Sequence, residues 1–253
     1  MIYIFDGTYA GFLTAVFESF EFKQFNITPV TAVLHSNSLF EEQTQIITDE
    51  DKFLRVKSGL EKRIGKNRAT DFYRAFLSED PKIWKISFRL IVEIFRGNTS
   101  ILENFGDQDV LLFHQTLRKI SRERHRMKAF VRFNKTSDGM FFALIEPDFN
   151  VLPLILPFFK NRYTDQSWLI YDVKRKYGCH YDTINIHEVV LDDFDQNKMQ
   201  TSSIGIALDE RDKLFENLWK HYFKSTNIEA RKNLKLHLQH VPKRYWKYLP
   251  EKK

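Results

Sequence analysis

Residues 129–150 read AFVRFNKTSDGMFFALIEPDFN, and this stretch decides the fold class. Apolar and polar residues alternate in Phe130–Phe133, and Met140–Ile145 is apolar and aromatic, which is typical of β-strands. Ser137–Gly139 between the two runs predicts a hairpin turn. The sequence therefore predicts an antiparallel strand pair that begins directly after a basic segment.

A helix and a second strand pair are expected next. Asp148 is expected to cap a helix over Val151–Tyr163. Trp168–Val173 and Tyr177–Tyr181 predict two more strands, which Ile184–Leu191 can extend. The order strand–strand–helix–strand–strand predicts an α+β fold, in which several helices pack against an antiparallel sheet.

Two regions are expected on either side of residue 80. Residues 1–80 predict an N-terminal subdomain of a strand plus helices, in which Thr8 caps the first helix. Asp80-Pro81 predicts the start of another helix, with proline at its first position. Residues 81–253 then form the α+β core, with C-terminal helices over 209–223 and from 226 onward, and a basic, aromatic tail.

Composition limits the class of protein. The 253 residues carry a formal net charge of +6, which favours acidic partners, although the excess over 33 acidic residues is mild. Cys179 is the single cysteine, which rules out an internal disulfide and fits a reducing compartment. The start of the chain predicts no signal peptide, and no apolar run approaches the roughly 20 residues of a membrane span. We expect a cytoplasmic globular protein.

The positive charge is concentrated in the residues that precede the predicted hairpin turn at Ser137–Gly139. Eight cations stand there against a single acid, Glu123: Arg118, Lys119, Arg122, Arg124, Arg126, Lys128, Arg132 and Lys135. Arg122 and Arg126 lie one helical turn apart, and a row of this kind can follow the phosphates of nucleic acid. Cations at a helix C-terminus also offset the helix dipole, which accounts for some of these charges.

Aromatic residues interleaved with cations give a second group of candidates. Tyr171, Tyr177 and Trp246 are expected to stack on bases, with Arg175 and Arg244 on phosphates. The alternatives are structural: Arg175 can pair with Asp172, and Trp246 can anchor the C-terminal segment to the core.

Acid/base chemistry has four candidates. They are His125, Glu146, Asp172 and Asp182. His125 has no identifiable acid partner in the sequence, and it is equally well explained as a buried hydrogen-bonding residue. No metal site or cofactor is expected, because Cys179-His180 and His187-Glu188 lack the spacing of metal ligands.

Five ordered blocks carry a family resemblance: YIFDGTYAGFLTAVFESF, HRMKAFVRF, FFALIEPDFNVLPLILPFFKNRY, SWLIYDVKRKYGCHYD and LWKHYFKSTNIEARKN with VPKRYWKYLPE. Together they resemble a family of bacterial DNA-metabolism or DNA-repair proteins of unassigned mechanism. Its members occur beside a radical-SAM DNA repair or modification protein, or are fused to a uracil-DNA-glycosylase-like domain. Phe149 stands where the family pattern P-D-H-N has histidine, so a catalytic role of that histidine is impossible here.

The resemblance and the basic segment together lead to one expectation. The chain is expected to bind DNA in a repair or modification pathway, with a radical-SAM protein as partner. Two other classes remain open: an enzyme that acts on a damaged base or nucleotide, and a non-catalytic adaptor whose basic face contacts a protein.

Overall fold

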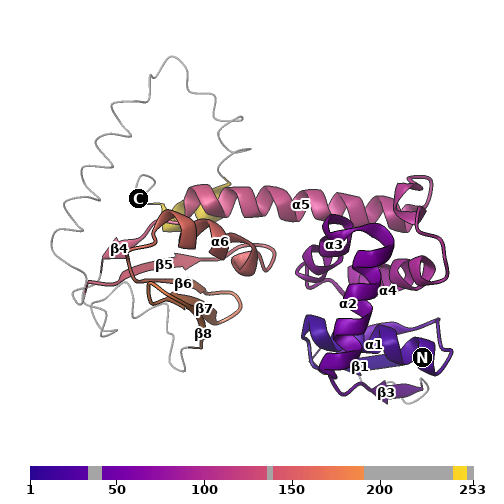
Figure 1. Ribbon diagram of the computed structural model, residues 1–253. Helices are drawn as coiled ribbons and strands as arrows, with labels where there is room; N and C mark the ends of the chain where they lie inside the picture. Colours follow the sequence, from indigo (N-terminus) through magenta and orange to yellow (C-terminus); the bar gives the residue numbers. More distant parts are fainter. Residues whose placement is uncertain (34–41, 136–138, 191–241, 250–253) are drawn as a thin grey trace. The chain divides into compact units, whose positions relative to one another are not determined.

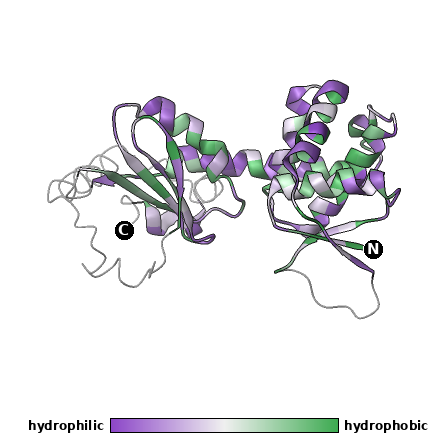
Figure 2. Ribbon diagram, turned by 60° about the horizontal axis from the view of Figure 1, so that its bottom comes forward, coloured by the Kyte–Doolittle hydropathy of each residue, from purple (hydrophilic) through white to green (hydrophobic). Residues whose placement is uncertain are grey.

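The computed structural model describes residues 1–33, 42–135, 139–190 and 242–249, and the chain folds as two compact units (Figure 1). Unit 1 is Met1–Ser121 and unit 2 is Arg122–Lys253. The division therefore falls at residue 121, whereas the sequence suggested a boundary at residue 80. In Figure 2, hydrophobic residues are seen on strands of unit 2 and on parts of the helices of both units. The predicted α+β class is confirmed.

Unit 1 contains a small parallel sheet. Its strands are β1 (Ile2–Phe5), β2 (Thr28–Thr31) and β3 (Gln43–Gln45), in the order β2-β1-β3. Helix α1 (Tyr9–Glu21) connects β1 to β2, which is the kind of crossover that parallel strands require. The three residues of β3 are all polar.

The start of α1 follows the prediction. The side chain of Thr8 accepts a hydrogen bond from the Gly11 amide, as an N-cap does. Phe12, Leu13 and Val16 are then fully buried, because their three-to-four spacing places them on one face of the helix.

The remaining helices of unit 1 are α2 (Glu50–Ile64), α3 (Lys66–Phe76), α4 (Pro81–Phe95) and the short 3-10 helix η1 (Ile101–Glu103). Asp80 caps α4, with proline at the first helical turn as predicted. The rings of Phe5, Phe76 and Trp84 meet in the core, at centroid distances between 5.4 and 6.2 Å. Aromatic burial thus joins β1 to α3 and α4.

Helix α5 (Gln108–Phe130) contributes to both units. Asp107 caps it by accepting hydrogen bonds from the amides of Asp109 and Val110. The helix continues to Phe130, so the predicted strand Phe130–Phe133 is wrong, and only the two-residue strand β4 (Asn134–Lys135) follows. The favourable helix propensity of the preceding Arg, Lys and Met residues extends the helix beyond the point where the alternation begins.

Unit 2 is built on a five-stranded sheet. After β4 come β5 (Phe141–Ile145), β6 (Trp168–Asp172), β7 (Tyr177–Tyr181) and β8 (Ile186–Val189), and the strands pair in this order. The pairings are antiparallel except for β5 with β6. Those two strands are parallel because α6 (Leu152–Arg162) crosses between them, lying against the sheet (Figure 1).

Two local predictions for unit 2 need correction or lie outside the description. Asp148 does not cap α6: the helix begins at Leu152, one residue later than predicted, and its N-cap residue is Val151, which makes no side-chain cap. The predicted helices over 209–223 and from 226 onward fall outside the described residues. In the C-terminal part, the described segment is the 3-10 helix η3 (Lys243–Tyr248), anchored by buried Tyr245 and by Leu249 after it. Among the described helices, none is long and apolar enough to cross a membrane.

The start of α1 provides a test of unit 1. Asp6 accepts hydrogen bonds from Thr8 and Thr48, and a Cβ atom at Gly11 would come within 2.3 Å of its carboxylate and 2.7 Å of the Thr48 hydroxyl. Helix propensity alone would make Gly11→Ala stabilising. We expect it instead to lower the free energy of unfolding by about 1–3 kcal/mol, because the site is overpacked.

Urea unfolding of the full chain checks this expectation. In the Asp6→Ala background the penalty of Gly11→Ala should shrink, because the closest atom is gone. An unchanged or higher stability of Gly11→Ala in the native background would contradict the packing described at this turn.

Candidate nucleic-acid interface

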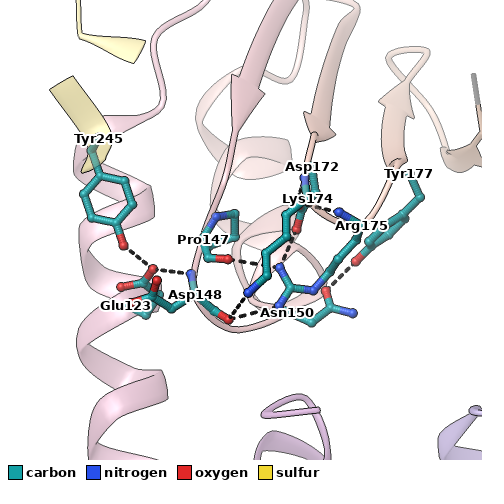
Figure 3. A network of polar contacts seen from close by, with 9 residues as sticks. All are labelled: Glu123, Pro147, Asp148, Asn150, Asp172, Lys174, Arg175, Tyr177 and Tyr245. Atoms are coloured by element: carbon teal, nitrogen blue, oxygen red, sulfur yellow. Dashed lines mark hydrogen bonds and ion pairs between the residues drawn. The ribbon is translucent and has the colours of Figure 1, made fainter. Parts of the chain in front are cut away.

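A buried carboxylate organises one end of unit 2. Glu123, on the last turns of α5, is 2% exposed. It accepts a hydrogen bond from the Asp148 amide at 2.8 Å and one from the hydroxyl of Tyr245. Figure 3 shows Glu123 between these two partners. The carboxylate therefore joins α5 to the loop between β5 and α6 and to η3.

Arg244 closes this arrangement from the solvent side. Its guanidinium lies 2.6 Å from the carboxylate of Asp148 and 3.5 Å from that of Glu123. Its side chain remains 42% exposed. Arg244 thus compensates the buried charge of Glu123 while it keeps part of its surface available at the rim.

The turn after β6 is held by a second buried carboxylate. Asp172 accepts from the amides of Lys174 and Arg175 at 3.0 and 3.2 Å, and from the Arg175 guanidinium at 2.9 Å. Burial raises the pKa of Asp172, and the opposing effect of Arg175 does not fully cancel this. Asp172 and Arg175 form a structural ion pair at 2.9 Å, and both side chains are buried or nearly so.

Arg175 also fixes the loop between β5 and α6. It donates to the carbonyl oxygens of Pro147 and Asp148 at 3.1 and 3.2 Å, and Lys174 reaches the Asp148 carbonyl at 3.2 Å (Figure 3). Tyr177 donates to the side chain of Asn150 at 2.5 Å. The loop is thus tied at both ends, to the β6–β7 turn and, through Glu123, to α5.

Glu146 is engaged in the same region. It accepts from the ammonium of Lys247 and, at 2.6 Å, from the hydroxyl of Tyr248. Partial burial pushes the pKa of Glu146 upward, but the hydrogen bonds from Lys247 and Tyr248 outweigh it, and the net pKa is lowered. Glu146 is therefore an ionised anchor for η3 and is poorly suited to act as a general base.

These segments enclose a pocket of about 410 Å³, which we call the cationic pocket. Pro147 and two carboxylates, Glu146 and Asp148, line it together with four cations: Lys174, Lys243, Arg244 and Lys247. Lys174 and Lys243 are exposed and form no ion pair with a described residue. The lining has an excess of two positive charges, which favours an anionic ligand.

The tyrosines that were expected to stack on bases are buried or held by other residues. Tyr171 has no exposed surface, so its ring is not available to a base in this structure. Tyr177 is held by Asn150, and Arg175 is held by Asp172 and the loop carbonyls. Trp246 is half-buried beside the rim. The structural alternative therefore explains Arg175, whereas Arg244 lies at the cationic pocket.

The basic end of α5 has mixed roles. Arg122 and His125 are exposed, so the buried alternative for His125 is wrong. Arg126 lies 3.7 Å from Glu123, and Lys128 lies over the ring of Phe158. Arg132 donates to the Ala129 carbonyl at 2.6 Å, which satisfies an acceptor left at the helix C-terminus.

The four acid/base candidates do not form one site. Asp172 pairs with Tyr177 at one end of β6 and β7, whereas Asp182 follows Tyr181 at the other end. Strand geometry separates them by roughly 15 Å. Hydrogen bonds from the amides of its own turn and from His187 lower the pKa of Asp182 to about 2, so it is an ionised turn residue.

Sequence reasoning missed several residues of this region. Glu123 was noted only as the exception in a basic run, although an isolated acid on a helix face is a signal for a buried partner. Lys243 and Lys247 belonged to a C-terminal cluster of cations whose three-dimensional neighbours were not foreseeable.

Within the described residues, no three His, Cys, Asp or Glu side chains gather as metal ligands would.

The buried carboxylate yields the first prediction for this region. Glu123→Gln should lower the free energy of unfolding by about 2 kcal/mol, because a charged acceptor of two hydrogen bonds is replaced by a neutral amide. Glu188→Gln, at an exposed position on β8, should stay within about 0.5 kcal/mol. Urea unfolding measures both.

A double-mutant cycle with Tyr245→Phe sharpens this measurement. Because the two residues share one hydrogen bond, their effects should be less than additive. Full additivity would show that η3 is not held by Glu123.

The lowered pKa of Glu146 yields a pH dependence. Its ionised form stabilises the fold above the unfolded-state pKa, about 4.3, and this contribution is lost as the pH falls through the lower folded-state pKa. Glu146→Gln should thus be less stable than the native chain at pH 6, and the difference should shrink at pH 3.5. Urea titrations at the two pH values check this. A pH-independent difference would contradict the ion pair with Lys247.

A match to a known protein family covers a large part of the chain. Residues 81–251 match a family described as a domain of unknown function, DUF4130. No curated protein and no solved structure matches the chain. The matched region covers well over half of the sequence and includes all described residues of unit 2. The chain therefore belongs to the DUF4130 family.

Proposed function

We propose that unit 2 binds DNA and that the cationic pocket contacts its backbone phosphates. The observation that carries this proposal is the convergence of Lys174 with three cations of η3, Lys243, Arg244 and Lys247, around one pocket. The two groups are about 70 residues apart in the sequence, so composition alone does not explain their meeting. Ammonium and guanidinium groups are the usual ligands of phosphate oxygens.

The hydrogen bonds that hold the segments carrying these cations favour the binding of phosphate. Lys174 lies in a turn held by Asp172, and η3 is anchored by Tyr245 through Glu123 and by Tyr248 through Glu146. A preorganised rim loses less side-chain freedom when an anion binds. The exposed Lys174 and Lys243 are the principal phosphate contacts, with Arg244 between them and the loop.

The family resemblance narrows the nucleic acid to DNA and adds a partner. A repair or modification pathway in which a radical-SAM protein acts on the same DNA is part of the proposal. The partner would be retained with this chain on affinity purification after nuclease treatment, if the two proteins bind each other directly.

An enzymatic role has less support. Asp172, Glu146 and Asp182 are each engaged in structural contacts, and Asp172 and Asp182 lie at opposite ends of their strands. These carboxylates hold the surface in place, and each already accepts hydrogen bonds from neighbouring protein groups.

The contribution of the cationic pocket to DNA binding can be tested with substitutions that leave the hydrophobic core unchanged. The double variant Lys174→Gln with Lys243→Gln should weaken DNA binding and reduce the slope of log affinity against log salt by up to about 2, because each phosphate contact contributes about 0.9 for duplex DNA. The matched control is Lys62→Gln with Lys85→Gln, two exposed lysines of unit 1 that change the net charge equally. Fluorescence anisotropy with labelled duplex and single-stranded DNA measures both.

Two results would contradict the proposal. One is an affinity that does not respond to salt, or no binding at all. The other is an equal loss in the control variant, which would assign binding to net charge and not to the cationic pocket. A chain that retains its radical-SAM partner but binds no DNA would select the adaptor alternative.

A further inference from the structure

A second pocket of about 520 Å³ lies within unit 2, and we call it the aromatic pocket. It is lined by the segment that leaves α5, by the first residue of β5, by the C-terminal end of α6 and by the start of β6. Its size lies within the range of roughly 300–1,000 Å³ that is typical of small-molecule sites. It shares no lining residue with the cationic pocket.

Strand register places the two pockets at opposite ends of the parallel pair. Phe141 and Trp168, which are paired, line the aromatic pocket. The other end of the same strands, at Ile145 and Asp172, carries the loop and turn that form the cationic pocket. Four residues of strand separate these ends by about 13 Å. The aromatic pocket is thus an independent site in unit 2.

Aromatic rings form the walls of this pocket. The ring of Phe133 lies 5.5 Å from that of Tyr163 and 6.3 Å from that of Trp168. Tyr163 stacks in turn on Phe159 of α6, with only 7° between the planes. Phe133 and Tyr163 are half-buried, so the wall is fixed by packing and still presents surface. A fixed aromatic surface of this kind suits a flat ring, which can stack on it.

The polar groups of the pocket indicate a ligand with negative charge. Two guanidinium groups, of Arg132 and Arg162, line it, and no carboxylate does. Guanidinium matches phosphate in geometry and charge. Gln166 adds an amide that can both donate and accept hydrogen bonds, as the edge of a nucleobase requires. Trp168 also lines the pocket, and its indole N–H is buried without a hydrogen-bond partner among the described residues.

We propose that the aromatic pocket binds a single nucleotide unit. The base lies against Phe133 and Tyr163, and the phosphate lies between Arg132 and Arg162. The ligand in this proposal is an unstacked nucleotide of a DNA strand. That source rests on the proposed function, which is DNA binding by unit 2. A free nucleoside monophosphate offers the same chemistry, and the experiment separates the two sources.

The direct experiment titrates the full chain with the four deoxynucleoside 5′-monophosphates. Isothermal titration calorimetry measures affinity. We expect saturable binding, with inorganic phosphate and deoxyribose 5-phosphate at least 10-fold weaker because they lack a base. Equal binding of deoxyribose 5-phosphate would overturn the assignment of the aromatic wall.

Variants then locate the site. Arg162→Gln removes an exposed guanidinium, and Tyr163→Leu removes a ring but keeps apolar volume. Each should weaken monophosphate binding at least 10-fold, whereas Arg118→Gln, at an exposed position of α5 in unit 1, should leave it unchanged. Thermal unfolding confirms that the variants are folded. Unchanged affinity in both pocket variants would overturn the proposal.

DNA binding by the same variants separates this proposal from the proposed function. If the pocket takes an unstacked nucleotide, the chain prefers single-stranded DNA or a duplex with a mismatch over a matched duplex, and Arg162→Gln removes that preference. Salt-dependent DNA binding without the preference, and without monophosphate binding, would overturn the aromatic pocket and leave the cationic pocket intact. Monophosphate binding without DNA binding would keep the nucleotide site, identify a free nucleotide as its ligand and reject the proposed function.

Discussion

Unit 2 depends on the burial of one negative charge. Removing the carboxylate of Glu123 from water is costly unless hydrogen bonds and a cation compensate it. The compensation comes from the Asp148 amide, Tyr245 and Arg244, which belong to segments far apart in the chain. Because no single segment can satisfy Glu123, the end of α5, the loop after β5 and η3 have to come together. The position of η3, and of the cations on it, follows from this requirement.

The carboxylates of this region hold its basic side chains in place. Asp172 holds the turn that carries Lys174, Glu123 and Asp148 hold Arg244, and Glu146 holds Lys247. Each carboxylate thereby orders a cation at or near the cationic pocket. This explains why the pocket contains two acids and still suits an anion: the paired cations are oriented, while Lys174 and Lys243 supply the excess charge.

Local signals made much of the fold predictable. Thr8 and Asp80-Pro81 start helices as expected because a capping bond involves only neighbouring residues. The strand–helix–strand order around α6 was readable from the apolar and aromatic runs of the two flanking strands. Strand β3 and the end of α5 were not, because a polar strand is stabilised by its partner in the sheet and alternation near a helix end competes with helix propensity.

The candidate site was less predictable, and the reason is burial. Tyr171 was expected to stack on a base, but all five residues from Trp168 to Asp172 are buried, so Tyr171 belongs to the core. Only tertiary packing distinguishes an arginine that anchors a loop, such as Arg175, from one at a rim, such as Arg244. The same sheet therefore has two chemically different ends: cations ordered by carboxylates at one, and aromatic rings beside two arginines at the other. A ligand that has both phosphates and flat rings matches both ends, and this shared match is a stronger argument for nucleic acid than either pocket alone.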